Sequence, residues 1–175
     1  MIRAAVVTIS DGVSAGTRED RSGAALAKRA GELSWTVEET HVVPDEAHAI
    51  STLVTALTVS GSIDVVITTG GTGVGPRDVT PEAVRAVADR EIPGLGELMR
   101  SEGLKKTRFA PLSRGAAYTR GKALILTLPG SPKGAVESLD AVAYLVTHVV
   151  DLLHGRTEHH ANFAAESAHD PKPSE

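Results

Sequence analysis

The stretch VVITTGGTGVGPRDVTPEAV, residues 65–84, joins an apolar run to a glycine-rich loop and then to a helix start. Residues 65–69 are all β-branched and the first three are apolar, which predicts a short buried strand. Thr80-Pro81-Glu82 supplies an N-cap, a proline suited to the first helical position and an acid that complements the helix dipole, so a helix is predicted over residues 81–90. The loop of residues 70–78 therefore lies where a strand gives way to a helix.

The same alternation of strand and helix continues on both sides of this stretch. Apolar, β-prone runs predict further strands at residues 4–9, 35–43 and 123–128. Apolar residues at helical spacing predict helices after an N-cap at Ser22 and around residues 50–57, 95–104 and 134–153, with Pro93 ending the helix before it. Such alternation predicts an α/β domain of three layers, a mainly parallel sheet flanked by helices, in which ligands lie beyond the carboxyl ends of the strands.

Length and composition predict one domain with an aliphatic core. A chain of 175 residues is long enough for one core of ordinary size and short for two. Aromatic residues make up only 3% of the chain, so Ala, Val, Leu and Ile must build the core. We predict a domain over residues 1–153, followed at residues 154–175 by a polar tail without apolar periodicity, much of which we expect to be mobile.

The formal net charge and the search for targeting signals limit which partners and which cellular location are expected. The formal net charge of −4 provides no chain-wide positive field for a polyanion, so we expect no nucleic-acid partner. The chain has no cysteine, which excludes disulfides, thiolate metal sites and a cysteine nucleophile. The chain enters an apolar run without a secretory signal, and no apolar stretch approaches the length of a membrane span. We therefore predict a cytoplasmic protein with no membrane partner.

The loop at residues 70–78 has the composition of an anion-binding loop. Its glycines allow unusual backbone angles and the close approach of a ligand, and flanking threonines add hydroxyl donors. These residues are Thr69, Gly70, Gly71, Thr72, Gly73 and Gly75. The loop is neither a Walker A motif nor a dinucleotide fingerprint, because no Gly-Lys-Ser/Thr follows and the glycine spacing differs. The alternative is a glycine-rich turn with a purely structural role.

A second strand-to-helix loop, LPGSPKG at residues 128–134, strengthens the prediction of an anionic ligand. Gly130 and Ser131 offer backbone and hydroxyl donors, and Lys133 offers a flexible positive charge. The alternative is a proline-fixed turn with an exposed lysine. The polar turn after the first predicted strand is more typical of a structural cap than of a ligand-binding loop.

Two carboxylates, Asp45 and Asp78, each stand at or shortly before a predicted helix start, so both are expected to line one rim of the sheet. One or two carboxylates, completed by water and substrate phosphate, suit Mg²⁺. Taken singly, Asp45 also fits an N-cap and Asp78 a turn residue.

Three segments together resemble the MogA/MoaB family of molybdopterin-binding proteins. They occur in the family's order and separation across roughly residues 2–153, and they are VTISD at 7–11, TTGGTG at 68–73 with RDVTPE at 77–82, and LPGSP at 128–132. The resemblance implies a domain like the G domain of gephyrin, with a parallel-sheet α/β architecture. It also implies a homotrimer or a higher oligomer, and a molybdopterin pocket at the strand ends.

In the adenylyltransferases of this family, the phosphate of molybdopterin attacks the α-phosphorus of ATP and releases pyrophosphate with the help of Mg²⁺. The resemblance implies that Asp45 and Asp78 act in catalysis and bind Mg²⁺. It also implies that Ser113, in the segment LSR, belongs to the binding site. The substrate-binding residues so predicted are Ser10, Asp11, Thr69, Gly70, Gly71, Thr72, Gly73, Ser113, Pro129, Gly130, Ser131 and Lys133. Arg77 and Lys133 are weaker candidates, because exposed cations often serve only solubility. The partners so predicted are molybdopterin, ATP and a downstream molybdenum insertion protein.

Two other functions stay open from the sequence. A noncatalytic molybdopterin-binding or carrier protein would use the same glycine loops without needing both carboxylates. An enzyme of pyridine-nucleotide processing, related to the competence-damage family, would have a similar glycine loop, although the chain is short for that family's extra domain. The direct run from Leu128 into the last helix is more similar to MoaB-type than to MogA-type chains, whereas the presence of Asp45 and Asp78 favours the enzyme.

Overall fold

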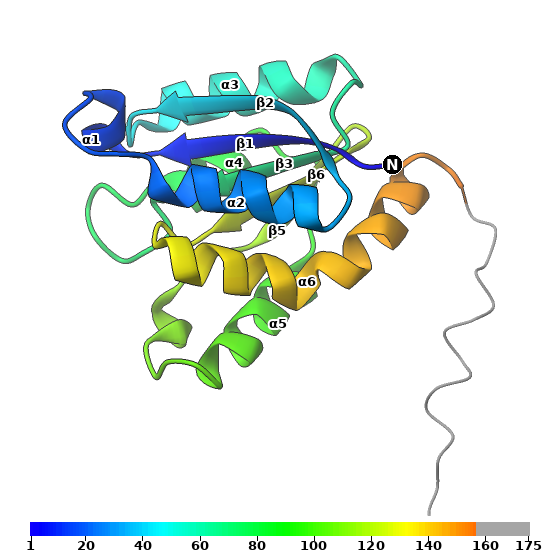
Figure 1. The fold of residues 1–175 in the computed structure, drawn as a ribbon. Coiled ribbons are helices and arrows are strands. Elements are labelled where there is room, and N and C mark those ends of the chain that lie inside the picture. The colour runs from blue at the N-terminus through cyan, green and yellow to red at the C-terminus, as the bar shows by residue number, and fades with distance from the viewer. Residues whose placement is uncertain (157–175) are drawn as a thin grey trace, which may run out of the picture.

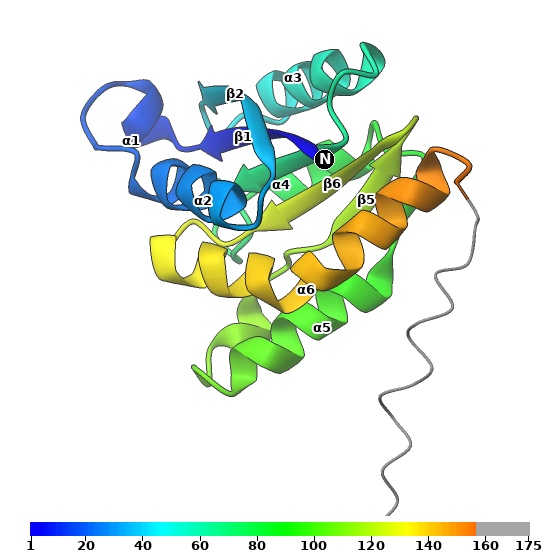
Figure 2. The ribbon, with the colours of Figure 1, turned by 45° about the vertical axis from the view of Figure 1, so that its right-hand side comes forward.

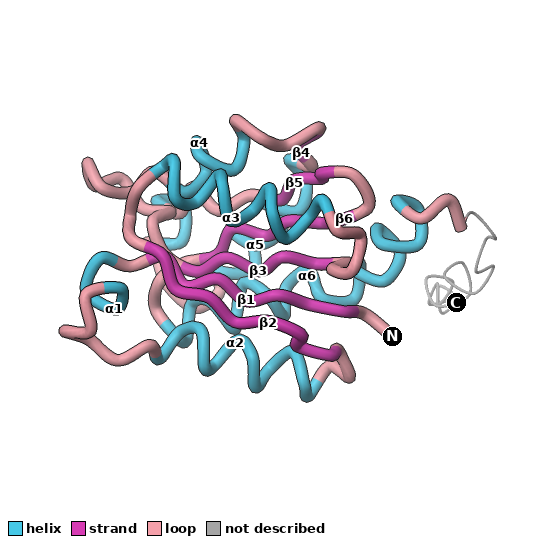
Figure 3. The backbone as a smooth tube through the Cα atoms, turned by 90° about the horizontal axis from the view of Figure 1, so that it is seen from above, coloured by secondary structure: helices cyan, strands magenta, loops and turns pink. Residues whose placement is uncertain are grey.

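The structure, a computed structural model, describes residues 1–156, which fold around one six-stranded sheet. Figure 1 shows the sheet, and Figure 3, which also labels β4, shows the strand order β2-β1-β3-β6-β5-β4. The strands are β1 (Arg3–Ile9), β2 (Thr36–Val43), β3 (Val65–Thr69), β4 (Arg90–Glu91), β5 (Ala117–Arg120) and β6 (Ala123–Leu128). The first four in this order run parallel, and β5 and β4 each pair antiparallel with the strand before them. The predicted mainly parallel α/β sheet is confirmed.

Helices cover both faces of the sheet and complete the three layers (Figures 2 and 3). One face carries α2 (Arg21–Glu32), α5 (Pro93–Leu104) and α6 (Pro132–Leu153), and the other carries α3 (Ala47–Val59) and α4 (Thr80–Arg85). Two one-turn helices, α1 (Asp11–Ser14) and η1 (Ala110–Leu112), lie between the larger elements. Successive residues of β3 face opposite layers, because Val65 and Ile67 pack with the first group and Val66 with the second.

Small aliphatic side chains build the core, as the composition predicts. On α6 the buried positions recur every three or four residues and form one apolar stripe, at Ala135, Leu139, Val142, Val146 and Val150. Full burial of one such valine or leucine side chain contributes about 1.5–3 kcal/mol relative to exposure. The helix begins at Pro132, two residues before its predicted start, with the Ser131 hydroxyl accepting the Gly134 N–H at 3.2 Å and Pro132 in the first position.

The N-caps predicted at Ser22 and Thr80 were wrong, because both residues lie inside their helices. The N-cap of α2 is Asp20, whose carboxylate accepts a backbone hydrogen bond of 2.8 Å, and Ser22 lies inside the helix. The N-cap of α4 is Val79, which makes no side-chain cap. The Thr80 hydroxyl donates instead to the Gly70 carbonyl at 2.9 Å and ties the helix to the preceding loop.

The prediction of a helix through residue 90 was also wrong. Helix α4 ends at Arg85, and the chain then forms β4 because an antiparallel partner is at hand. On either side of β4, the N–H groups of Asp89 and Ile92 donate hydrogen bonds of 2.8 Å to carbonyls of β5. Pro93, predicted to end the earlier helix, instead begins α5.

The polar tail predicted at residues 154–175 begins directly after α6, and its residues 157–175 lie outside the part of the chain that the structure describes. Among the described residues, no helix combines the length and apolar character that crossing a membrane requires.

A charged cluster lies where β1 and β3 begin. Asp64, 5% exposed, accepts a hydrogen bond of 2.9 Å from the Arg3 backbone N–H and bonds of 2.8 and 3.0 Å from its guanidinium. His154, just beyond α6, places its Nε2 3.2 Å from Asp64 Oδ1. Burial disfavours the charged carboxylate, but the Arg3 hydrogen bonds outweigh burial and hold the pKa of Asp64 below its ordinary value.

Asp64→Asn is expected to lower the free energy of unfolding at pH 7 by about 2 kcal/mol, because buried hydrogen bonds to a charged group are lost. The folded-state pKa is lowered, so this stabilisation is complete above the ordinary carboxyl value, about 3.9, and is lost as the pH falls through the folded value. Urea unfolding at several pH values measures the difference. Asp140→Asn, in the exposed pair with Arg29, is the control and should change stability by less than about 1 kcal/mol. Equal losses in both variants would contradict the role assigned to Asp64.

Candidate functional site

Loops from four parallel strands meet at one edge of the sheet, beyond their carboxyl ends, where folds of this architecture place ligands. The predicted site residues on them are Ser10 and Asp11 after β1, Asp45 after β2, residues 70–78 after β3 and residues 129–133 after β6. A further segment, between η1 and β5, joins this edge because the Arg114 N–H donates to the Thr72 carbonyl at 2.8 Å. The structure therefore brings Ser113 to the same edge.

Gly70 is required where the loop leaves β3. Its φ is +107°, and a Cβ there would collide with the Ile9 carbonyl oxygen at the end of β1. Its N–H donates to the Leu128 carbonyl at 3.1 Å. Gly71, with a φ of +63°, would place a Cβ 3.3 Å from Asp45 Oδ1 and against the Thr80 hydroxyl. These glycines serve a close crossing of backbones and also keep the space beside Asp45 open.

The threonines and the loop after β6 hold this crossing together. The Thr69 hydroxyl donates to the Pro129 carbonyl at 2.7 Å, so its proton is engaged within the protein. Thr72 is buried. Gly130 lies so close to Gly70 that a Cβ at Gly130 would be 3.2 Å from its Cα. The loops after β3 and β6 therefore form one connected wall.

Asp78 lies inside the turn that closes the glycine loop. Its Oδ2 accepts the Gly75 N–H at 2.7 Å, and a Cβ at Gly73 would lie 2.8 Å from the same oxygen. No hydrogen bond within the described chain reaches its Oδ1. Asp78 is thus a turn residue, one of the two interpretations that the sequence left open, and one of its carboxylate oxygens accepts no hydrogen bond from the described chain.

Asp45 lies beside Gly71 and is not an N-cap, because Glu46 is the N-cap of α3. Asp45 Oδ2 accepts the Asp11 N–H at 2.8 Å, and the Asp45 N–H donates to Asp11 Oδ1 at 3.0 Å. Asp45 Oδ1 accepts no hydrogen bond from residues 1–156. The hydrogen bond from the Asp45 backbone, followed by that from the Arg77 side chain, holds the pKa of the Asp11 carboxyl below its ordinary value.

Arg114 is a structural residue of the site that the sequence reasoning missed. Its Nε donates to the Gly73 carbonyl at 2.6 Å, and its other nitrogens contact the Asp78 carbonyl and the Glu82 carboxylate. One guanidinium thus fastens the glycine loop to the start of α4. Its only signal in the sequence is its position beside Ser113.

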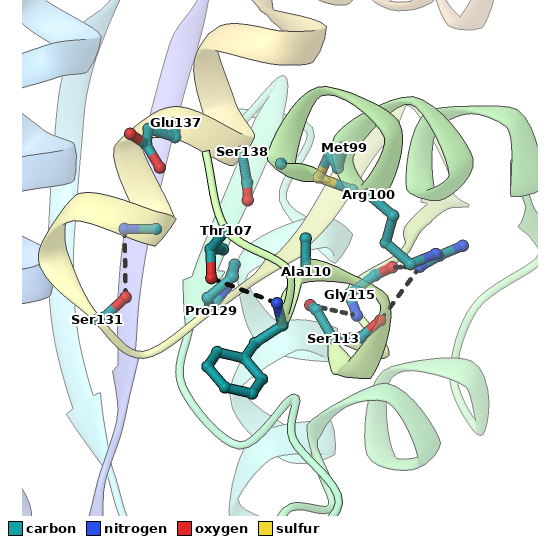
Figure 4. Close-up of a pocket in the computed structure, with 13 residues that line it drawn as sticks. Met99, Arg100, Thr107, Ala110, Ser113, Gly115, Pro129, Ser131, Glu137 and Ser138 are labelled. Atoms are coloured by element: carbon teal, nitrogen blue, oxygen red, sulfur yellow. Dashed lines mark hydrogen bonds between the residues drawn. The ribbon is translucent and has the colours of Figure 1, made fainter. Parts of the chain in front are cut away.

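An apolar cavity of about 190 Å³ lies between α5, η1 and the start of α6 (Figure 4). Met99, Phe109 and Pro129 supply much of its wall, and the predicted residues Ser113 and Ser131 also line it. The Ser113 hydroxyl accepts the Gly115 N–H at 3.2 Å. The cavity has the chemistry to hold a flat ring with polar groups at its edge.

A polar cavity of about 440 Å³ lies on the other side of the loop after β6. Ser10, Thr69 and Gly130 line it together with Arg18 and Arg21. The first residues of α6 border this cavity, and this helix N-terminus favours a negative charge there. The N-terminus of α2 also borders it but is capped by the Asp20 carboxylate, which lines the cavity together with Glu19.

The predicted residues are not equally close to these cavities. Neither Asp45 nor Asp78 lines either of the two, although Thr69, directly before the loop between the carboxylates, lines the polar one. Lys133 lines neither, and its 84% exposed side chain is 4.0 Å from Glu137. Within residues 1–156 no cluster of three or more metal-binding side chains occurs.

The mainly parallel sheet and its loop-built edge define an α/β ligand-binding domain of the strand-end type. The chain belongs to the family described as the probable molybdopterin binding domain, which matches residues 5–148.

Individual relatives agree with this membership. The molybdopterin adenylyltransferase of Helicobacter pylori strain J99 is 41% identical over 156 residues, covering 88% of this chain and 89% of that protein. The enzyme of that name from Escherichia coli K12 is 43% identical, covering 88% of this chain and 79% of that protein. The crystal structure of the molybdopterin biosynthesis enzyme MoaB from Thermus thermophilus matches with a TM-score of 0.83 at 45% identity, covering 89% of this chain and 98% of that one. The resemblance to the MogA/MoaB family is confirmed.

Gly70→Ala is expected to destabilise the fold by more than about 3 kcal/mol, because backbone strain of about 1–3 kcal/mol is joined by the collision with Ile9. Gly16→Ala is the matched control, since Gly16 has a φ of +69° but no neighbouring atom within 4 Å of the place that an alanine methyl group would take. That variant should lose only about 1–2 kcal/mol. Urea unfolding compares the two variants, and equal losses would show that Gly70 is not needed for the close crossing.

Proposed function

We propose that this chain transfers AMP from ATP to molybdopterin in molybdenum cofactor biosynthesis, releasing pyrophosphate. Its similarity to two molybdopterin adenylyltransferases over most of both chains supports this activity. The observation that carries the proposal is the placement of Asp45 beside Gly71 and of Asp78 beside Gly73 and Gly75, each with one carboxylate oxygen that accepts no hydrogen bond from the described chain.

The reaction needs alignment more than it needs a reactive side chain. An oxygen of the molybdopterin phosphate forms a bond to the α-phosphorus of ATP while the bond to pyrophosphate breaks, so no covalent enzyme intermediate is required. Holding two reactants in line contributes up to about 7–11 kcal/mol to lowering a barrier. The hydrogen bonds that fix the loops after β3 and β6 against each other provide a rigid frame for this alignment.

The two cavities suit different parts of the substrates. The apolar cavity, with Phe109 and Met99, would take a flat ring, and Ser113 would bond to its polar edge. The polar cavity would take phosphate groups, through the N-terminus of α6 and the guanidinium group of Arg18, while Arg21 is paired with Glu19. Gly130 and Ser131, between the cavities, would contact the bound molecules at the junction of these parts.

The residues present fit a Mg²⁺ ion. Mg²⁺ is commonly held by one or two carboxylates together with substrate phosphates and water, and Asp45 and Asp78 each have one carboxylate oxygen without a hydrogen bond from the described chain. Asp45 and Asp78 would hold the ion, which when bound offsets negative charge on the phosphates. We also propose, from the family resemblance, a homotrimer in the cytoplasm that passes its product to a molybdenum insertion protein.

Purified protein with molybdopterin, ATP and Mg²⁺ is expected to release pyrophosphate. Asp78→Asn should lower turnover by about 100-fold or more, because the site loses a carboxylate charge that would hold the ion offsetting the negative charge of the phosphates. The dissociation constant of molybdopterin should change by less than about 3-fold, since uniform binding does not depend on that charge.

Asp89→Asn is the matched control, because Asp89 also accepts a backbone N–H, from Gly121 at 2.7 Å, but lies in another turn. Its turnover should equal that of the unaltered protein. Molybdopterin binding without pyrophosphate release would indicate a noncatalytic carrier, and full turnover in Asp78→Asn would reject the role assigned to that residue.

A further inference from the structure

The direction of the Asp45 side chain is fixed by its contacts with Asp11. Asp45 follows β2, which is an edge strand, and it makes no cap to α3 that would orient it. Instead, each of the two aspartates accepts the backbone N–H of the other, at 2.8 and 3.0 Å. This reciprocal pair uses Oδ2 of Asp45 and leaves Oδ1 beside Gly71, at the glycine loop.

Arg77 fixes the Asp11 carboxylate in turn. The Arg77 Nε donates to Asp11 Oδ2 at 3.1 Å, and its Nη2 lies 2.9 Å from both carboxylate oxygens of Asp11. A planar guanidinium that meets both oxygens fixes the plane of a carboxylate, which a lysine ammonium does not. Because Asp11 Oδ1 also accepts the Asp45 N–H, Arg77 fixes Asp11 and the backbone of Asp45 together.

A stabilising role does not explain this ion pair. The side chains of Arg77 and Asp11 are 60% and 50% exposed, and exposed pairs are screened by water and contribute little to folding. The pair nevertheless joins the loop after β3 to the loop after β1 across 66 residues of sequence. Arg77 also precedes Asp78, so one residue connects the segments that carry both free carboxylate oxygens.

The charges of Asp11 and Arg77 favour a role in positioning Asp45 over a direct contact of either residue with substrate. Alone, the Asp11 carboxylate would repel both Asp45 and an incoming phosphate. Paired with Arg77, its charge is offset, and the guanidinium is turned to Asp11 and away from bidentate phosphate binding. Asp11, predicted as a substrate contact, and Arg77, a weak candidate in the sequence, therefore share a different role.

We propose that Asp11 and Arg77 are positioning residues, which hold the Asp45 carboxylate in its working direction and couple it to the turn that carries Asp78. This inference rests on the proposed function only for the catalytic role of Asp45. The hydrogen bonds that carry it do not depend on the identity of the substrates.

A double-mutant cycle tests the proposal. Arg77→Ala and Asp11→Ala should each lower kcat about tenfold, because a small misplacement of a reacting group is costly. The double variant should be no slower than the slower single variant, since both changes disrupt one unit. Dissociation constants for molybdopterin and a non-hydrolysable ATP analogue should stay within about 2-fold, and Arg77→Lys should recover part of kcat.

Arg156→Ala is the matched control, because Arg156 donates through Nε to Asp151 at 2.8 Å in an exposed pair after α6. Its kcat should not change. Additive losses in the cycle, or a weaker affinity for either substrate with unchanged kcat, would overturn the proposal in favour of direct substrate contacts.

Backbone amide hydrogen exchange provides a readout that does not depend on turnover. In Arg77→Ala the amides of Asp11 and Asp45 should exchange about tenfold faster, because the carboxylates that accept them are no longer fixed. If the unaltered protein releases no pyrophosphate, the proposed function fails, while faster exchange still supports the positioning role. Unchanged exchange at both amides overturns the positioning role in either case.

Discussion

The backbone of Gly70 passes so close to the Ile9 carbonyl that no side chain fits between them, and the site depends on this crossing. At this point the ends of β1, β3 and β6 are joined, because Gly70 also bonds to Leu128 and packs against Gly130. The turn that follows places Gly71 beside Asp45 and carries the chain on to Asp78. A constraint on one residue therefore determines how four separate loops face one another.

The sequence was most informative where local pattern and burial agree. The bounds of β3 and β6 were predicted correctly, because both are short apolar runs whose residues are buried between two layers of helices. The two-residue strand β4 could not be predicted, since it exists only through pairing with β5. The cap at Asp20 was missed in favour of Ser22, because both are good capping residues two positions apart.

For the site, the sequence indicated which loops converge but not what their side chains contact. Parallel strands place their carboxyl ends at one edge, so Asp45, Asp78 and the glycine loop could be grouped from their order alone. The partners of Arg77 and Arg114 lie 66 and 32 to 41 residues away in the chain, and no local pattern encodes such bonds. The arginines therefore looked alike in the sequence, although these two hold the edge together.

The turn after β6 is a wall common to two cavities, since Pro129 and Ser131 line the apolar one and Gly130 and Pro132 line the polar one. Molecules on either side of such a wall are thermodynamically linked. If an occupant of one cavity shifts the turn and changes the affinity of the other by some factor, the second occupant changes the affinity of the first by the same factor. The hydrogen bond from Thr69 to the Pro129 carbonyl, 2.7 Å long, ties this turn to the end of β3 and so restrains such a shift.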